Sequence, residues 1–219
     1  VARDALSKKE EFGVNLDTDR KAAIAEIRRL GTSAGGQRAK AIIAYNKDTG
    51  EVRSGQITAP EGFDYYIIKL DGVSAEAGFK ETENYGRLEY SFPVLVQKAG
   101  TDMTACSLIY EHGRAHFLTK RFDRENGKKI HMQTLCGIAH YDFRLLRGYS
   151  YEQTFNVMRA LHLPYSQAQE MFRRMVFNTV LRNQDDHTKN ISFLMGTDGR
   201  WRLSPAYDMG FAYNPSGSW

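Results

Sequence analysis

A short polar segment near the end of the chain, residues 183–190 with the sequence NQDDHTKN, gathers carboxylate, amide, imidazole and ammonium groups. Four residues separate Asp185 from Asn190, an interval that suits phosphoryl transfer. In that chemistry the carboxylate positions a hydroxyl nucleophile, and the amide oxygen helps to bind magnesium, which prefers oxygen ligands. Asp186 fits the interval less well. Taken alone, the segment also suits a polar loop between a helix and a strand.

A second carboxylate follows this segment. Residues 203–210, LSPAYDMG, come after a short hairpin pattern, and Asp208 stands where a phosphotransferase needs another magnesium-binding carboxylate. Met209 replaces the Phe of a D-F-G motif. A lone aspartate after a strand is usually a turn residue. The combination of D-x-x-x-x-N, hairpin and aspartate, however, favours a kinase.

A kinase also needs a strand lysine that reaches the α- and β-phosphates, held by a helix glutamate through a charge-assisted bond. Lys69 ends the β-rich run DYYIIK, and Glu89 lies in the next helical pattern. We therefore predict an ion pair between these two side chains. The alternative is that Lys69 is an exposed lysine at a strand end.

Residues 31–40, GTSAGGQRAK, form a loop of small residues ahead of a strand pattern. Small residues such as Ser33, Gly35 and Gly36 let backbone N–H groups approach phosphates. The loop matches neither G-x-G-x-x-G nor the Walker A pattern, and by itself it is typical of a flexible turn.

Strand patterns dominate the first half of the chain. Apolar spacing predicts one helix over residues 22–30, with Thr18 as its cap. A second helix is predicted within 84–99, kinked or shortened at Pro93 because an interior proline costs about 3 kcal/mol. Strands are predicted at residues 41–45, 51–56, 65–70, 107–111 and 114–120, the last two as a hairpin.

Helical patterns dominate the second half. Capping boxes that begin at Ser150 and Ser166 predict helices over residues 151–161 and 167–181. The apolar side of the second helix consists of Phe172, Met175, Val176 and Thr179. Because strands come first and helices second, followed by a hairpin within 191–203, we predict an α+β protein.

Composition narrows the class of protein. A length of 219 residues with 42% hydrophobic residues suits one large domain or two packed lobes. The net charge of +4 is mild, and without a nucleic-acid-binding motif it argues against direct binding of DNA or RNA. Cys106 and Cys136 form neither a disulfide framework nor a zinc ribbon, which favours a reducing compartment. No apolar run approaches the roughly 18 residues of a membrane span.

Together the motifs resemble the HipA family of bacterial toxin kinases. The matching runs are TSAGGQRAK at 32–40, IIKL at 67–70, KRFDR at 120–124, NQDDHTKN at 183–190 and SPAYDM at 204–209. The resemblance implies a two-lobed protein-kinase-like fold. Its small β-rich N-lobe would span residues 1–122, with the Gly-rich loop and the hinge, and its helical C-lobe would span 123–219. Typical members also have an N-terminal subdomain and final C-terminal helices that this chain would lack.

Carried over by position, the resemblance implies roles for three residues of the polar segment and for Asp208. Asp185 becomes the catalytic base. His187 becomes a hydrogen-bond donor to the transferring phosphate. Asn190 and Asp208 become the magnesium ligands.

The resemblance also implies the contacts with ATP. Lys69 becomes the phosphate-binding lysine, held by Glu89. Lys120 through Phe122, at the junction of the lobes, would give backbone hydrogen bonds to adenine. The Gly-rich loop would cover the phosphates.

The resemblance thus predicts a cytoplasmic, ATP- and Mg²⁺-dependent serine/threonine protein kinase that acts as the toxin of a toxin–antitoxin pair. Family precedent implies a helix-turn-helix antitoxin as partner, the only route to nucleic acid, and an aminoacyl-tRNA synthetase as substrate. Members can be inactivated by phosphorylation of the Gly-rich loop, where Thr32 or Ser33 matches. Two alternatives stay open: a small-molecule kinase of the aminoglycoside type, and a catalytically silent module that binds an antitoxin or companion chain.

Overall fold

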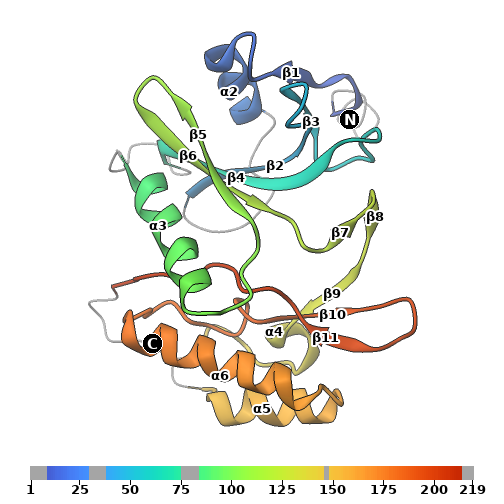
Figure 1. Ribbon diagram of the computed structural model, residues 1–219, viewed down its shortest axis with the longest axis vertical. Helices are drawn as coiled ribbons and strands as arrows, with labels where there is room; N and C mark the ends of the chain where they lie inside the picture. The colour runs from blue at the N-terminus through green and yellow to red at the C-terminus, as the bar shows by residue number, and fades with distance from the viewer. Residues whose placement is uncertain (1–8, 30–37, 75–83, 146–147, 214–219) are drawn as a thin grey trace. The chain divides into compact units, whose positions relative to one another are not determined.

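The computed structural model describes residues 9–29, 38–74, 84–145 and 148–213 (Figure 1). The chain divides into two compact units: unit 1 is Val1–Tyr90 with Ala105–Lys128, and unit 2 is Ser91–Thr104 with Lys129–Trp219. The sequence predicts a single division after residue 122. The structure instead groups Ser91–Thr104 with unit 2, where Met103 forms a parallel bridge with Ala206.

Unit 1 is built on a six-stranded antiparallel sheet with the strand order β1-β3-β2-β4-β6-β5. The strands are β1 (Gly13–Asn15), β2 (Arg38–Tyr45), β3 (Glu51–Ser54), β4 (Asp64–Ser74), β5 (Cys106–Glu111) and β6 (Arg114–Lys120). The five predicted strands are confirmed, although β2 and β4 are longer than predicted and β3 is shorter. The predicted hairpin is also confirmed, because β5 pairs with β6 from Cys106↔Thr119 to Glu111↔Arg114.

Alternation along β4 decides which side chains enter the core of unit 1. Tyr66, Ile68 and Leu70 are buried in a cluster with apolar residues of β2 and of helix α2 (Arg20–Arg29). Successive side chains of a strand point to opposite faces. Lys69 and Asp71 therefore share the other face, which directs two charged groups away from this core.

The cap of α2 differs from the prediction. The Asp19 carboxylate, not Thr18, accepts a hydrogen bond from the backbone N–H of Ala22 at 2.9 Å. The Thr18 hydroxyl instead donates to the carbonyl of Asn15. The prediction of Thr18 as the cap is wrong because Asp19 immediately precedes the first helical residue, where a carboxylate satisfies an end N–H group.

Helix α3 (Tyr85–Lys98) continues for 14 residues through Pro93, so the helix is not shortened there. Its residues up to Tyr90 belong to unit 1, and those from Ser91 belong to unit 2. The first turn touches the sheet backbone: a Cβ at Gly86 would lie 1.7 Å from the carbonyl oxygen of Ala115. Only glycine permits this approach.

Unit 2 combines a three-stranded antiparallel sheet, of order β11-β10-β9, with helices. The elements are β9 (His131–Thr134), α4 (Leu135–Ile138), α5 (Tyr151–Ala160), α6 (Tyr165–Val180), β10 (Ser192–Met195) and β11 (Trp201–Leu203). The short strands β7 (Arg124–Glu125) and β8 (Lys128–Lys129) precede them. Phe193, Met171 and Leu135 are at the centre of its apolar cluster. The predicted final hairpin, now β10–β11, is confirmed.

The two predicted capping boxes have different outcomes. Ser150 caps α5 through a complete box, with its side chain accepting from the N–H of Gln153. The box at Ser166 is wrong, because α6 begins at Tyr165 behind Pro164 and has no side-chain cap.

The apolar side predicted for α6 is not its buried face. Phe172 is 54% exposed, whereas Glu170, Arg174 and Asn178 are buried beside Met171. Charged and amide groups at a spacing of four residues find partners inside unit 2.

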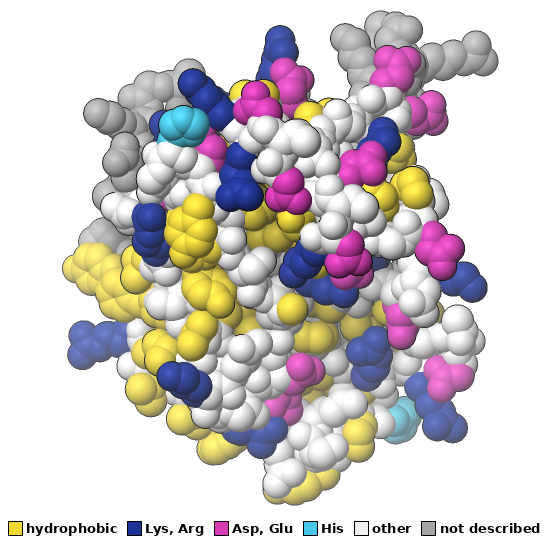
Figure 2. Space-filling view, turned by 45° about the horizontal axis from the view of Figure 1, so that its top comes forward, with side chains coloured by type: hydrophobic (Ala, Val, Ile, Leu, Met, Phe, Trp, Pro, Cys, Tyr) yellow, Lys and Arg dark blue, Asp and Glu magenta, His cyan; other side chains and the backbone are white. Residues whose placement is uncertain are grey.

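Charges are mixed on the surface. In Figure 2, Lys and Arg side chains (dark blue) are interspersed with Asp and Glu side chains (magenta) over the visible described residues. An extended basic surface, which DNA and RNA binding requires, is not seen on this face. None of the helices in the described ranges has the length and apolar character of a membrane span.

Candidate active site

Residues 183–190 form a compact loop between α6 and β10. The carbonyl of Asp185 accepts hydrogen bonds from the backbone N–H of His187 at 3.1 Å and from the side-chain amide of Asn190 at 2.9 Å. A direct hydrogen bond therefore joins Asp185 and Asn190, the two residues of the predicted D-x-x-x-x-N interval. Because the amide nitrogen of Asn190 donates to this carbonyl, the amide oxygen is the atom oriented for a cation.

The two neighbouring aspartates have different surroundings. The Asp185 side chain is 63% exposed, and its Oδ1 lies 3.8 Å from Nε2 of His187. The Asp186 carboxylate accepts from the Tyr151 hydroxyl of α5, which in turn accepts from the Asn178 amide of α6 at 3.1 Å. Burial raises the pKa of both the Asp186 carboxyl and the Tyr151 hydroxyl. Asp186 thus fixes the loop, whereas the Asp185 carboxylate is exposed to solvent.

Asn190 and Asp208 line one small cavity of about 10 Å³, together with Asp186 and Arg174. Asp185 is not part of its lining. This volume holds about one water-sized sphere. In the described residues, no three Asp, Glu, His or Cys side chains cluster closely enough to hold a metal by themselves.

The donors of this cavity fit magnesium. Mg²⁺ usually keeps several waters and binds one or two carboxylates together with substrate phosphates, so it does not need a cage of protein ligands. An amide oxygen from Asn190 and a carboxylate from Asp208 are hard donors of this kind. Asp208 has a left-handed backbone, with φ of 52°, just after Tyr207. The Tyr207 hydroxyl donates to the carbonyl of Lys189 at 2.6 Å, which fixes one ligand segment against the other.

His187 packs against an aromatic ring. The His187 and Phe143 rings meet edge to face with centroids 5.6 Å apart, and Nζ of Lys189 lies 3.3 Å from the Phe143 centroid. The Thr188 hydroxyl, between them, donates to the carbonyl of Tyr141 at 2.9 Å. The segment before α5 thus restrains the side chains that flank Thr188. The proposed hydrogen bond from His187 to a phosphate stays a prediction.

In unit 1, the Lys69 ammonium forms an ion pair with the Glu89 carboxylate, the partner predicted for it. Both side chains are largely buried, at 16% and 17% exposed. Nζ of Lys69 also lies 5.7 Å from the centroid of the Phe117 ring on β6. The alternative of a solvated strand-end lysine therefore does not describe this side chain.

Asp71, two residues after Lys69, anchors the start of α3. Its buried carboxylate accepts from the backbone N–H groups of Asn84 at 3.2 Å, Tyr85 at 3.1 Å and Ala115 at 3.1 Å. Strand β4 therefore holds the helix that carries Glu89 at two points, through Lys69 and through Asp71.

We expect Asp71→Ala to lower the free energy of unfolding by about 2 kcal/mol, because buried N–H groups lose their acceptor. Urea denaturation measures the change. Asp48→Ala, at an exposed aspartate of the β2–β3 turn, is the control and should change stability by less than about 0.5 kcal/mol. Equal stabilities of the Asp71 variant and the wild type would contradict the anchoring role.

The end of β6 and the residues directly after it carry the predicted adenine contacts, Lys120 and Phe122. The N–H of Lys120 donates to Ala105 and that of Arg121 donates to Tyr65, both at 2.8 Å. The Lys120 ammonium binds Asp64 at 2.7 Å. The backbone of this segment is therefore fixed in unit 1, and its contact with adenine stays a prediction.

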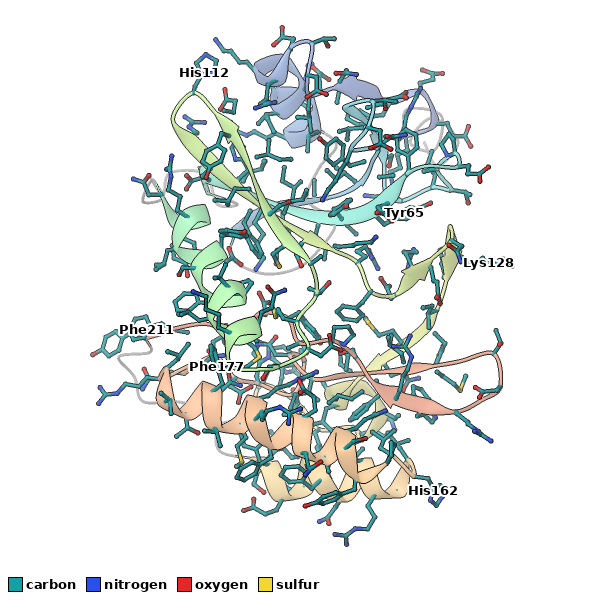
Figure 3. The ribbon with its side chains drawn as sticks, viewed as in Figure 1. Tyr65, His112, Lys128, His162, Phe177 and Phe211 are labelled. Atoms are coloured by element: carbon teal, nitrogen blue, oxygen red, sulfur yellow. The ribbon has the colours of Figure 1, made fainter. Side chains whose placement is uncertain are left out.

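A buried ion-pair cluster follows directly. Asp123 accepts from both nitrogens of the Arg121 fork, at 2.8 and 2.6 Å, and from Arg124 at 2.7 Å. The Arg124 guanidinium lies 5.7 Å from the ring centroid of Tyr65, which is labelled in Figure 3. Burial alone would raise the pKa of Asp123, but the two arginines outweigh it and lower that pKa.

We expect Asp123→Asn to cost about 3 kcal/mol of unfolding free energy at neutral pH, because two largely buried guanidinium groups lose their counter-charge. The folded-state pKa lies below the ordinary value of 3.8. The carboxylate therefore stabilises the fold above that value, and its contribution is lost as the pH falls through the folded-state pKa. Urea denaturation should show a smaller difference in unfolding free energy between the variant and the wild type at about pH 3 than at neutral pH. Asp198→Asn, at an exposed Asp–Arg pair of the β10–β11 turn, should change little at either pH.

The predicted residues fall into two groups. Unit 1 contains Lys69, Glu89, Lys120 and Phe122, and unit 2 contains Asp185, His187, Asn190 and Asp208. The predicted phosphate-loop and phosphorylation residues, Thr32, Ser33, Gly35 and Gly36, lie outside the described residues.

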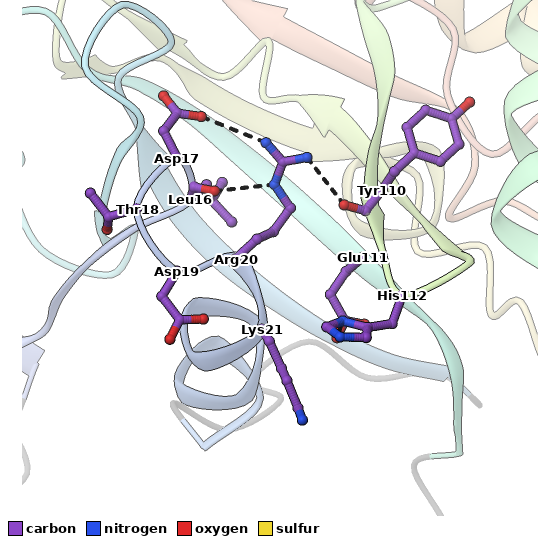
Figure 4. A pocket seen from close by; sticks show the side chains of 9 residues that line it. All are labelled: Leu16, Asp17, Thr18, Asp19, Arg20, Lys21, Tyr110, Glu111 and His112. Atoms are coloured by element: carbon purple, nitrogen blue, oxygen red, sulfur yellow. Dashed lines mark hydrogen bonds and ion pairs between the residues drawn. The ribbon is translucent and has the colours of Figure 1, made fainter.

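A larger cavity in unit 1, of about 390 Å³, contains none of the predicted residues (Figure 4). It lies between the start of α2 and the end of β5, beside His112. The Arg20 guanidinium there binds the carbonyls of Leu16 and Tyr110 and the Asp17 carboxylate. Its positive charge is thus matched within the fold, and the cavity is not associated with the candidate chemistry.

Sequence reasoning missed four residues that support the site: Asp71, Tyr151, Arg174 and Asn178. A signal existed for some of them. Arg174 and Asn178 follow Glu170 at helical spacing, which marks a polar stripe on α6. Asp71 shares a strand face with Lys69. Nothing in the sequence indicates that the Tyr151 hydroxyl meets Asp186, a contact across 35 residues.

Comparison with known proteins gives consistent relatives. The family model described as the HipA-like C-terminal domain matches residues 32–218. A Haemophilus influenzae protein named "Putative kinase" is 25% identical over 134 residues, covering 55% of this chain and 39% of its own length. "Putative kinase Y4dM" of Sinorhizobium fredii is 33% identical over 102 residues, covering 45% of this chain and 24% of its own length.

A solved structure has the same fold. HipA, in the complex of the Shewanella oneidensis MR-1 toxin–antitoxin system with HipB and operator DNA, matches with a TM-score of 0.61 at 19% identity. The match covers 82% of this chain and 44% of that one. The predicted α+β, kinase-like fold is thereby confirmed. The chain spans less than half the length of each of these relatives.

Proposed function

Because the chain belongs to the HipA-like C-terminal domain family, we propose that it is an ATP- and Mg²⁺-dependent serine/threonine protein kinase that acts as the toxin of a bacterial toxin–antitoxin pair. One observation carries the proposal. The exposed Asp185 is tied through its carbonyl to Asn190, and Asn190 shares a cavity with Asp208. A base beside two hard oxygen donors is the arrangement that phosphoryl transfer uses.

In the proposed reaction, the oxygen of a serine or threonine hydroxyl forms a bond to the γ-phosphorus of ATP. The bond from that phosphorus to the bridging oxygen breaks, and ADP leaves. Asp185 orients the hydroxyl and accepts its proton. Magnesium held by Asn190 and Asp208 would neutralise charge on the phosphate oxygens.

Two further side chains have proposed roles toward the phosphates. His187 donates a hydrogen bond to the transferring group. Lys69 binds the α- and β-phosphates, and Glu89 keeps its ammonium group in place. The ion pair supports this role because a charge-assisted bond restrains an otherwise flexible lysine.

Incubation with γ-labelled ATP and Mg²⁺, followed by mass-spectrometric mapping, tests the function. We expect label on a serine or threonine, either on Thr32 or Ser33 of the protein itself or on an added protein substrate. Label found only on aminoglycosides or sugars would support a small-molecule kinase instead. A folded protein that binds no Mg·ATP in calorimetry would support the silent binding module.

We extend the proposal to the surroundings of the enzyme. The matched HipA is seen with HipB and operator DNA, which supports an antitoxin as the partner of this chain. We propose a helix-turn-helix antitoxin, with nucleic acid bound only through it, and an aminoacyl-tRNA synthetase as substrate in the cytoplasm. Co-elution with the antitoxin in size-exclusion chromatography, and labelling of the synthetase, are the expected results.

A further inference from the structure

The backbone of the segment that carries Asp208 is bound by a second segment of unit 2, residues 102–104. The N–H of Ala206 donates to the carbonyl of Asp102 at 2.7 Å, and the N–H of Thr104 donates to the carbonyl of Ala206 at 3.2 Å. Met103 and Ala206 pair as a parallel bridge. Both polar backbone groups of Ala206, two residues before Asp208, are therefore used by residues 102–104.

Residues 102–104 are held in turn by α6. Oε1 of Glu170 accepts from the backbone N–H of Asp102 at 3.0 Å and from Nε of Arg174 at 3.0 Å. The other end of the Arg174 guanidinium donates to the Asp102 carbonyl at 3.4 Å. One side-chain pair thus binds the N–H and the carbonyl of the same residue, and that carbonyl is the acceptor for Ala206.

The pair is buried beside the cavity of Asn190 and Asp208. The side chains of Glu170 and Arg174 are 11% and 6% exposed, and Arg174 lines that cavity. A buried ion pair adds little net stability compared with apolar residues of similar volume. A role in fixing the backbone beside the cavity explains its presence better.

We propose that Glu170 and Arg174 are positioning residues that hold the Asp208 carboxylate in place for a divalent cation, acting through residues 102–104 and Ala206. This inference rests on the proposed function for its cation. Neither residue is assigned a contact with substrate, so both act through the backbone. Outer-shell partners of metal ligands commonly change metal affinity by 10- to 100-fold when they are replaced.

Arg173 provides a matched control. It also binds Glu170, at 2.6 Å, but from the solvent side, where it is 46% exposed. Among the described residues, the hydrogen bonds of the Arg173 guanidinium go to Glu170 and not to Asp102. Both Arg173→Gln and Arg174→Gln therefore remove a guanidinium group that binds the Glu170 carboxylate. Only Arg174→Gln also removes a hydrogen bond to the backbone carbonyl of Asp102.

Two measurements on the purified protein test the proposal. Titration with Mn²⁺ in the presence of ADP, followed by electron paramagnetic resonance, should show affinity at least about tenfold weaker for Arg174→Gln and within about twofold of wild type for Arg173→Gln. Hydrogen exchange should become faster at the N–H groups of Thr104 and Ala206 in the Arg174 variant alone. Arg174→Lys, which keeps the charge but cannot bridge both partners, should lie between the two.

Equal effects of the Arg173 and Arg174 variants on both measurements would overturn the proposal, as would wild-type exchange at Ala206 in Arg174→Gln. If Arg174→Gln does not fold, Arg174→Lys and Glu170→Gln provide the same comparison. A wild-type protein that binds no Mn²⁺ would overturn the proposed function instead. The exchange data would then decide by themselves whether Glu170 and Arg174 hold Ala206.

Discussion

Replacing Asp185 with asparagine is expected to lower the rate of phosphate transfer by about 10²–10⁴-fold, the range that a general base contributes. The amide cannot accept the proton of the substrate hydroxyl. Because the side chain is 63% exposed, the free energy of unfolding should barely change. Transfer from labelled ATP, measured under single-turnover conditions beside urea denaturation, checks both parts.

The adjacent aspartate provides the contrast. Asp186→Ala should lower the free energy of unfolding by about 1–3 kcal/mol, because the largely buried Tyr151 hydroxyl loses its acceptor. The assignments would be contradicted if Asp185→Asn lost stability but transferred phosphate normally, while Asp186→Ala kept its stability but lost transfer. Asp186 would then be the base and Asp185 the structural residue.

Replacing Asp208 with asparagine is expected to reduce transfer by about three orders of magnitude at a fixed Mg²⁺ concentration. Charge stabilisation by a catalytic cation is worth several kcal/mol, and 1.36 kcal/mol corresponds to a tenfold change in rate. The Asp208 variant should also need a much higher Mg²⁺ concentration to reach its maximal rate. Chelation by EDTA should abolish the activity of the wild type.

Asp198→Asn is the matched control for Asp208→Asn. Asp198 lies in the β10–β11 turn, 61% exposed, and pairs only weakly with Arg200 at 3.7 Å. Its replacement should leave the Mg²⁺ dependence unchanged. An Asp208 variant with a wild-type Mg²⁺ profile would exclude this carboxylate as a ligand.

Local patterns predicted the elements of this fold well where they reflect backbone geometry. The β-rich run of residues 65–70 identifies β4, and the Ser150 box identifies the start of α5. The Lys69–Glu89 pair was also predictable, because Lys69 ends a predicted strand and Glu89, of opposite charge, lies in the next predicted helix.

Features that depend on tertiary contacts were not predictable in this way. The helical spacing of Phe172 and Val176 indicates an apolar face, but not that the polar stripe would be the buried one. Helix α3 continues through Pro93 despite the local cost of an interior proline. Asp71 has no motif, since its role depends on three N–H groups brought together by folding.

The proline of α3 lies at an informative place. Proline has no N–H group, so Pro93 cannot donate the hydrogen bond that would close the turn with residue 89. That turn includes the step from Tyr90 to Ser91, where the helix leaves unit 1. Helix α3 is therefore most easily bent where it passes from unit 1 to unit 2. This step lies within four residues of Glu89, whose carboxylate binds Lys69. The chain thus passes from one unit to the other at a turn of α3 that lacks one backbone hydrogen bond.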